Sequence, residues 1–194
     1  CLPDRLDYPC YPECGDCKAC NWISCEDDVG FLLSITQSLK ESLLVDPDRF
    51  YLLGNSNGGS MVQRLGCDYP DHFAAVGIMI YQMPPGHACG PREALPMLHY
   101  YGVHDDEVPH DGKPSPYGWV YTSAAENTRV WAETMGCNGP AVPWQTALTQ
   151  EHDLQCEAYT DCQSEGVAVV SCGDPAAGHE WEAQRIHAIP ADCV

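Results

Sequence analysis

A serine stands between glycines in the stretch "YLLGNSNGGSM", residues 51–61. Gly54 and Gly58 lie two residues on either side of Ser56, an apolar run precedes them and a helical pattern follows. A strand that turns directly into a helix strains its pivot residue, and flanking glycines remove side chains that would collide there. The pattern predicts that Ser56 is a nucleophile on such a turn, with the Asn57 N–H as an oxyanion donor at the helix N-terminus. A flexible glycine-rich loop is the alternative.

A nucleophilic serine needs a base, and the base needs an orienting carboxylate. The segment "HDDEVPHDG" offers Asp105 and Asp106 after an apolar run, and "GDPAAGHEW" offers His179 after another. Because the carboxyl ends of parallel strands meet at one edge of a sheet, we expect these side chains to converge near Ser56. The sequence therefore predicts a Ser, Asp, His order of catalytic residues.

Two metal sites are conceivable alternatives. Asp105, Glu107 and Asp111 could form a weak divalent-cation site, although the same segment also reads as a solvated acidic turn. The run "CGDCKAC", residues 14–20, has the spacing of zinc and iron–sulfur sites. Since the chain holds 13 cysteines spread over its length, disulfides in an oxidising compartment are favoured. We predict no metal and no cofactor.

Strand and helix patterns alternate along the 194 residues, which predicts a single α/β domain, 1–194, with a largely parallel sheet. Residues 1–27 read as a cysteine-rich loop, and residues 136–166 as a disulfide-stapled insertion. The strand 50–54 reads as buried on both faces. The other strands are expected at 73–81, 96–103 and 166–172, and the helices at 28–44, after the glycines up to residue 68, at 121–135 and at 180–188.

The net charge of the chain is strongly negative, which bears on the partners it can bind. Nine Lys and Arg face 28 Asp and Glu, a net charge of −19, which disfavours nucleic acids and anionic membranes. No apolar run is long enough for a membrane helix. Because the number of cysteines is odd, at least one thiol is free or pairs outside the chain. We expect a secreted, extracellular protein.

The segment "VDPDRFYLLGNSNGGSMVQRLGCDYPDHFAAV" resembles the nucleophile region of the polyhydroxybutyrate depolymerase and feruloyl esterase group. These are secreted α/β-hydrolases related to acetyl xylan esterases. The segment "LHYYGVHDDEVPHDG" is similar to their His-Gly-x-x-Asp-x-x-Val-Pro motif, which implies that Asp105, not Asp106, is the acid. "GHEW" resembles their Gly-His-x-Trp motif, which implies that His179 is the base. The resemblance implies a serine carboxylic ester hydrolase acting on polyester or plant-cell-wall esters.

The group also begins with further strands and a His-Gly loop that supplies a second oxyanion N–H, and this sequence has no counterpart of them. We therefore expect an α/β-hydrolase-type sheet with flanking helices that lacks those first strands and is rich in disulfides. Either a second polypeptide, which the odd cysteine could link to this one, supplies them, or the sequence is a fragment or a processed product. The alternative function is a non-catalytic extracellular structural or binding protein that retains the stapled hydrolase fold.

Overall fold

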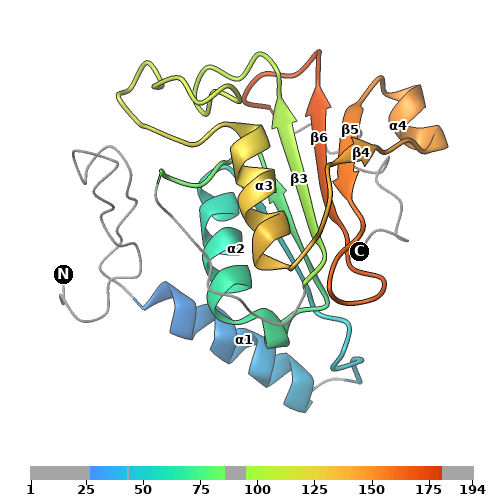
Figure 1. Cartoon of the computed structure of the whole chain (residues 1–194). Coiled ribbons are helices and arrows are strands. Elements are labelled where there is room, and N and C mark those ends of the chain that lie inside the picture. Colours follow the sequence, from blue (N-terminus) through green and yellow to red (C-terminus); the bar gives the residue numbers. More distant parts are fainter. Residues whose placement is uncertain (1–26, 43, 86–94, 181–194) are drawn as a thin grey trace.

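The computed structural model describes residues 27–42, 44–85 and 95–180 (Figure 1). The predictions for the loop 1–27, apart from its last residue, and for the helix 180–188, beyond its first residue, lie outside these residues. In chain order the elements are α1 (Asp28–Ser42), β1 (Tyr51–Asn55), α2 (Asn57–Asp68), the 3₁₀ helix η3 (Pro70–His72), β2 (Ala75–Met79), β3 (Met97–Gly102), α3 (Ala124–Thr134), β4 (Val142–Pro143), α4 (Ala147–Glu151), β5 (Gln155–Tyr159) and β6 (Val169–Asp174).

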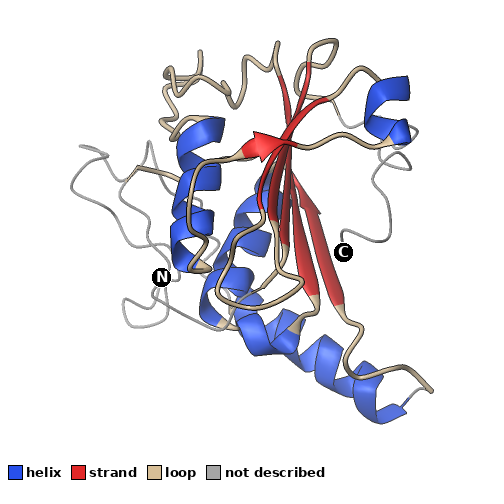
Figure 2. Ribbon diagram, turned by 45° about the vertical axis from the view of Figure 1, so that its right-hand side comes forward, coloured by secondary structure: helices blue, strands red, loops and turns tan. Residues whose placement is uncertain are grey.

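The six described strands form one sheet in the order β1-β2-β3-β6-β5-β4. Strands β1, β2, β3 and β6 are mutually parallel, β5 pairs antiparallel with β6, and β4 pairs antiparallel with β5. Figure 2 shows α2 and α3 on one side of the sheet and the short α4 on the other. The predicted largely parallel α/β sheet with flanking helices is therefore confirmed.

The core lies on both faces of the sheet. On the helix side, Leu65 of α2 and Trp131 of α3 are fully buried against Ile78 and Met97 of the central strands. A second apolar cluster on the opposite face contains Tyr100 and, with it, Met79, Leu98, Val170 and Cys172. Apolar side chains on both faces of β2, β3 and β6 explain why these strands read as continuous hydrophobic runs in the sequence.

The prediction that the first strand is buried on both faces is wrong. Tyr51 and Leu53 are each 50% exposed, whereas Leu52 between them packs against the helix-side core. Since side chains alternate along a strand, Tyr51 and Leu53 share one face. Among the described residues β1 pairs only with β2, so it is the edge strand of the sheet.

Residues 136–166 contain strands that the sequence analysis missed. Strand β5 pairs antiparallel with β6, and the disulfide Cys156–Cys172 joins these two strands. A second disulfide, Cys137–Cys162, closes the base of the insertion. The predicted stapling is confirmed, but the segment extends the sheet instead of forming only a loop. The signal was present in "QCEAY", where polar and apolar residues alternate as in a half-buried strand.

Candidate active site

Ser56 is the single residue between β1 and α2. Its backbone has φ 50° and ψ −120°, a left-handed conformation that a non-glycine residue rarely adopts. The Ser56 N–H donates to the carbonyl of Met79 at 2.9 Å, and the Ser56 carbonyl accepts from Gly59 at 2.8 Å. The turn is thus held both by the neighbouring strand β2 and by the first turn of α2. The prediction that the glycine-flanked serine stands on a strained strand-to-helix turn agrees with this geometry.

The reason for the glycines is only partly as predicted. A Cβ atom at Gly54 would lie 2.2 Å from the carbonyl oxygen of Gly58, so only glycine fits there. The prediction that Gly58 also removes a colliding side chain is wrong, because a Cβ at Gly58 meets no atom within 4 Å. The second close approach is at Gly59, where a Cβ would lie 2.8 Å from the Cβ of Tyr81. The tight packing therefore occurs one residue later than the sequence motif suggests.

The side chains of Ser56, His179 and Asp105 lie in one hydrogen-bonded series. His179 Nδ1 lies 2.8 Å from Asp105 Oδ2, and His179 Nε2 lies 2.9 Å from Ser56 Oγ. A carboxylate only accepts hydrogen bonds, so the imidazole proton resides on Nδ1. Nε2 then carries the lone pair that faces the serine hydroxyl. The arrangement can accept the Ser56 proton when the oxygen attacks an electrophile.

Asp105 is held in place by its own turn. Its carboxylate is buried, and Oδ1 accepts the backbone N–H groups of Glu107 and Val108, each at 2.8 Å. The other oxygen, Oδ2, is left for His179. Because both oxygens are occupied, the carboxylate has one orientation. Asp106, the other acid that the sequence offered, is exposed and has no such contacts with the imidazole.

The loop that carries His179 is anchored by a residue that the sequence analysis did not identify. Asp174, the last residue of β6, is fully buried; its Oδ1 accepts the Ala176 N–H and its Oδ2 accepts the Tyr100 hydroxyl, both at 2.8 Å. The His104 N–H donates to the Ala177 carbonyl at 2.9 Å, which ties this loop to the loop after β3. The Asp-Pro pair at residues 174–175 was the available signal, because Asp before Pro commonly starts a turn.

The charges around the imidazole favour its protonated form. The hydrogen bond that His179 donates to Asp105 raises the pKa of His179 above its ordinary value. Partial burial lowers this pKa, whereas the negative charges of Asp105 and Glu107 raise it further. Glu107 Oε2 lies 3.7 Å from His179 Nε2. These charges therefore stabilise an imidazolium ion at His179.

Asn57 is the first residue of α2, a helix of 12 residues whose N-terminal end carries a partial positive charge next to Ser56. The first N–H groups of a helix have no partner within the helix. Within the described ranges the Asn57 N–H has no acceptor among the backbone contacts, whereas Gly59 and Ser60 both donate to Ser56. The Asn57 N–H is therefore available for a negatively charged oxygen.

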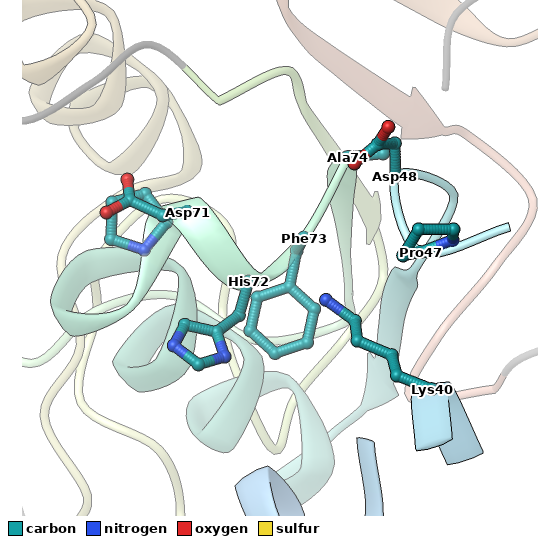
Figure 3. A pocket seen from close by; sticks show the side chains of 8 residues that line it. Lys40, Pro47, Asp48, Asp71, His72, Phe73 and Ala74 are labelled. Carbon is teal, nitrogen blue, oxygen red and sulfur yellow. The ribbon is translucent and has the colours of Figure 1, made fainter. Parts of the chain in front are cut away.

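A hollow of about 340 Å³ lies at the end of the sheet opposite to Ser56 (Figure 3). It is lined by Lys40, Pro47, Asp48 and residues 70–74, which precede the first residue of β2. Ser56, by contrast, follows the last residue of the parallel strand β1. Another hollow, of about 440 Å³, borders Asp105 and is lined by residues 103–106 and 109–116 with gaps. Of these two hollows, the second lies at the edge of the sheet that carries Ser56.

Within the ranges that the structure describes, no group of three or more His, Cys, Asp or Glu side chains is arranged to hold a metal ion. The alternative cation site at Asp105, Glu107 and Asp111 is therefore not supported, because Asp105 contacts His179 instead. The cysteine run 14–20 lies outside the described residues. None of the described helices has the length and apolar character needed to span a membrane.

Comparisons with known proteins give relatives whose names are those of esterases and a depolymerase. The chain is 30% identical over 161 residues to feruloyl esterase B of Piromyces equi, covering 79% of this chain and 29% of the relative. It is 30% identical over 106 residues to the poly(3-hydroxybutyrate) depolymerase of Ralstonia pickettii, covering 54% of this chain and 17% of the relative. No protein-family model matches the chain.

Among solved structures, the acetyl xylan esterase from Aspergillus awamori matches with a TM-score of 0.54 at 15% identity, covering 77% of this chain and 61% of that one. This likeness shows a shared fold. Together with the sequence relatives it confirms the predicted resemblance to the polyhydroxybutyrate depolymerase and feruloyl esterase group. The chain spans less than a third of the length of the curated relatives it matches, at most 32%.

Proposed function

We propose that this relative of the feruloyl esterase and polyhydroxybutyrate depolymerase group is a secreted serine carboxylic ester hydrolase in which Ser56 is the nucleophile, His179 the general base and Asp105 the orienting acid. The observation that carries the proposal is the unbroken series of contacts from Ser56 Oγ through both nitrogens of His179 to the buried carboxylate of Asp105, at 2.9 and 2.8 Å. The esterase names of the relatives support the same reaction class.

In this proposal, Ser56 Oγ attacks the ester carbonyl carbon while His179 Nε2 takes the hydroxyl proton. The Asn57 N–H donates to the oxyanion of the tetrahedral intermediate, and Asp105 stabilises the imidazolium ion. The imidazolium then protonates the leaving alcohol as the ester C–O bond breaks, which leaves an acyl-Ser56. Water attacks this acyl group with His179 as base, and the acid is released with Ser56 restored. The residues need no cofactor for these steps.

The substrate class that we propose is a polyester or a plant-cell-wall ester: a hydroxyalkanoate polymer, a feruloylated polysaccharide or an acetylated xylan. Its support is the printed names of the relatives and of the structural neighbour. The two described disulfides and the disulfide-bonded Cys67 support an oxidising, extracellular location.

We also propose that a strand of a second polypeptide pairs with β1. Its support is the edge position of β1 among the described strands and the half-exposed side chains of Tyr51 and Leu53. An unpaired apolar edge readily accepts another strand. Intact mass of the natural protein, with and without reductant, tests this: a single mass equal to this chain in both states, together with a monomer in solution, would contradict it.

A fluorophosphonate probe tests the catalytic assignment. We expect one equivalent of adduct on Ser56, no adduct in Ser56→Ala, and strongly reduced labelling in His179→Ala. Ser38→Ala, an exposed serine on α1, is the matched control and should label as the wild type does. Absence of labelling and of ester hydrolysis in folded, disulfide-intact protein would instead favour the non-catalytic structural or binding protein.

A further inference from the structure

Two oxygen atoms face the same nitrogen of His179. Ser56 Oγ lies 2.9 Å from Nε2, and Glu107 Oε2 lies 3.7 Å from it. The second distance is too long for a hydrogen bond, so Glu107 acts on the site through its charge. Its side chain is 54% exposed, so the carboxylate stands at the solvent-facing rim of the site. The Glu107 carboxylate therefore lies near the nitrogen that is hydrogen-bonded to Ser56.

The position of Glu107 is fixed by the turn that orients Asp105. The Glu107 N–H donates to Asp105 Oδ1 at 2.8 Å, one residue before the Val108 N–H does the same. This hydrogen bond holds the backbone of Glu107 in the same turn as Asp105. The side chain of Glu107 therefore leaves the backbone close to the imidazole of His179. Asp105 contacts Nδ1 and Glu107 approaches Nε2, so carboxylates flank the imidazole on both sides.

The neighbouring charges do not neutralise Glu107. Asp106 on the same turn and Glu180 beside His179 are exposed and add further negative charge. Lys113, a cation of the loop after β3, is engaged in an ion pair with Asp111. A substrate at Ser56 therefore meets a negative electrostatic potential at the rim.

We propose that Glu107 is a specificity-determining residue that makes the Ser56 site select uncharged esters over esters bearing a negative charge near the reacting carbonyl. This inference rests on the proposed function of Ser56. A substrate carboxylate or sulfonate several ångströms from the carbonyl carbon is repelled by Glu107, whereas an uncharged chain is not. The same repulsion acts on the carboxylate product formed when water cleaves the acyl-Ser56, and so it favours product release.

The experiment compares wild type with Glu107→Gln on two 4-nitrophenyl esters of equal length. One is the anionic 4-sulfobutanoate ester, whose sulfonate is a poor nucleophile, and the other is the uncharged 4-(methylsulfonyl)butanoate ester. We expect the ratio of kcat/KM for the anionic ester to that for the neutral ester to rise about three- to tenfold in Glu107→Gln, the size of a partly screened charge pair. The kcat/KM for the neutral ester should change less than this ratio.

Further measurements separate charge from shape. In 0.5 M NaCl the wild-type discrimination should shrink because the Debye length falls to about 4 Å. Glu107→Asp keeps the charge and should retain part of the discrimination, whereas Glu107→Ala should behave like Glu107→Gln. Glu151→Gln, an exposed carboxylate on α4, is the control and should leave the ratio unchanged.

Two failures can be told apart. An unchanged ratio in Glu107→Gln and Glu107→Ala, with both variants folded and hydrolysing the neutral ester through Ser56, overturns the role of Glu107. Absence of hydrolysis and of fluorophosphonate labelling in the wild type overturns the proposed function, and with it this inference. The inference is supported if the ratio of kcat/KM for the anionic ester to that for the neutral ester is higher in both uncharged variants than in the wild type, and if this difference disappears in high salt.

Discussion

Gly102 and Gly178 are in backbone contact across the candidate site. A Cβ atom at Gly102, the last residue of β3, would lie 2.2 Å from the carbonyl oxygen of Gly178 and 2.6 Å from that of Ala177. Gly178 immediately precedes His179. The strand that leads to Asp105 and the loop that carries His179 are therefore brought together because one of them has no side chain at this point.

We predict that Gly102→Ala separates His179 from Ser56. The backbone atoms that the methyl group would meet cannot rotate away, so the loop 175–179 must move as a whole. Displacement of a catalytic group by about 1 Å can lower the rate about 10²-fold. The check is kcat/KM for a neutral 4-nitrophenyl ester together with the rate of fluorophosphonate labelling. Wild-type values for both, in a folded variant, would show that the loop adapts without cost.

Gly54 and Gly58 provide a matched pair for stability. In Gly54→Ala the new methyl group meets the backbone of Gly58 and the side chain of Val62, so we expect a loss of about 1–3 kcal/mol in the free energy of unfolding. In Gly58→Ala the methyl group meets nothing, and replacing a helical glycine should stabilise by about 0.5–1 kcal/mol. Thermal unfolding of both variants with disulfides intact is the measurement. Equal melting temperatures would contradict the packing described for this turn.

The sequence allowed the strand-to-helix turn at Ser56 to be predicted because its determinants are local. An apolar strand, a glycine-flanked serine and a helical pattern follow one another within residues 50–65. What could not be predicted depends on other segments: Gly59 is required because Tyr81 comes close from the end of β2. Likewise, the partial exposure of β1 depends on its place at the edge of the sheet, which a single strand's residues do not encode.

The approach of His179 and Asp105 to Ser56 followed from a general rule, that parallel strands bring their carboxyl ends to one edge of the sheet. The contacts that hold these residues in their positions were not predicted from the sequence. Asp174 holds its turn through the hydroxyl of Tyr100 on the neighbouring strand, a contact between residues 74 positions apart. Glu107 appeared in the sequence only as a conceivable cation ligand, and its approach to His179 emerges from the folded turn.

A buried histidine outside the site should limit stability in acid. His99 on β3 is fully buried, and this burial lowers its pKa to about 4. In the unfolded chain the imidazole takes up a proton below about pH 6.5, whereas in the folded protein it stays neutral until about pH 4. The unfolded state therefore binds more protons between these values, and stability falls as the pH falls. This difference in proton binding lowers the free energy of unfolding by roughly 3 kcal/mol at pH 4 relative to neutral pH.

We expect this contribution to disappear in His99→Gln. The measurement is the free energy of unfolding at pH 7 and at pH 4.5 for wild type and variant, with disulfides intact. The loss between the two pH values should be smaller in His99→Gln, whatever the variant's stability at pH 7. An equal loss in both proteins would mean that His99 does not resist protonation in the fold. His152→Gln, a partly exposed histidine after α4, is the control and should retain the wild-type loss.

The pH dependence of hydrolysis should report the contact between Asp105 and His179. Only the neutral imidazole can accept the Ser56 proton, and Asp105 raises the pKa of His179. kcat/KM should therefore rise with pH and reach half its plateau above pH 6.5, the ordinary value for histidine. In Asp105→Asn the carboxylate that raises the pKa of His179 is lost, so we expect the midpoint of the kcat/KM profile at lower pH. The imidazole tautomer is also no longer fixed, so we expect the plateau of kcat/KM to be about 10⁴-fold lower. The profile of kcat/KM from pH 5 to 9 for both proteins is the check, and an unchanged midpoint in Asp105→Asn would refute the assignment of Asp105 as the partner of the base.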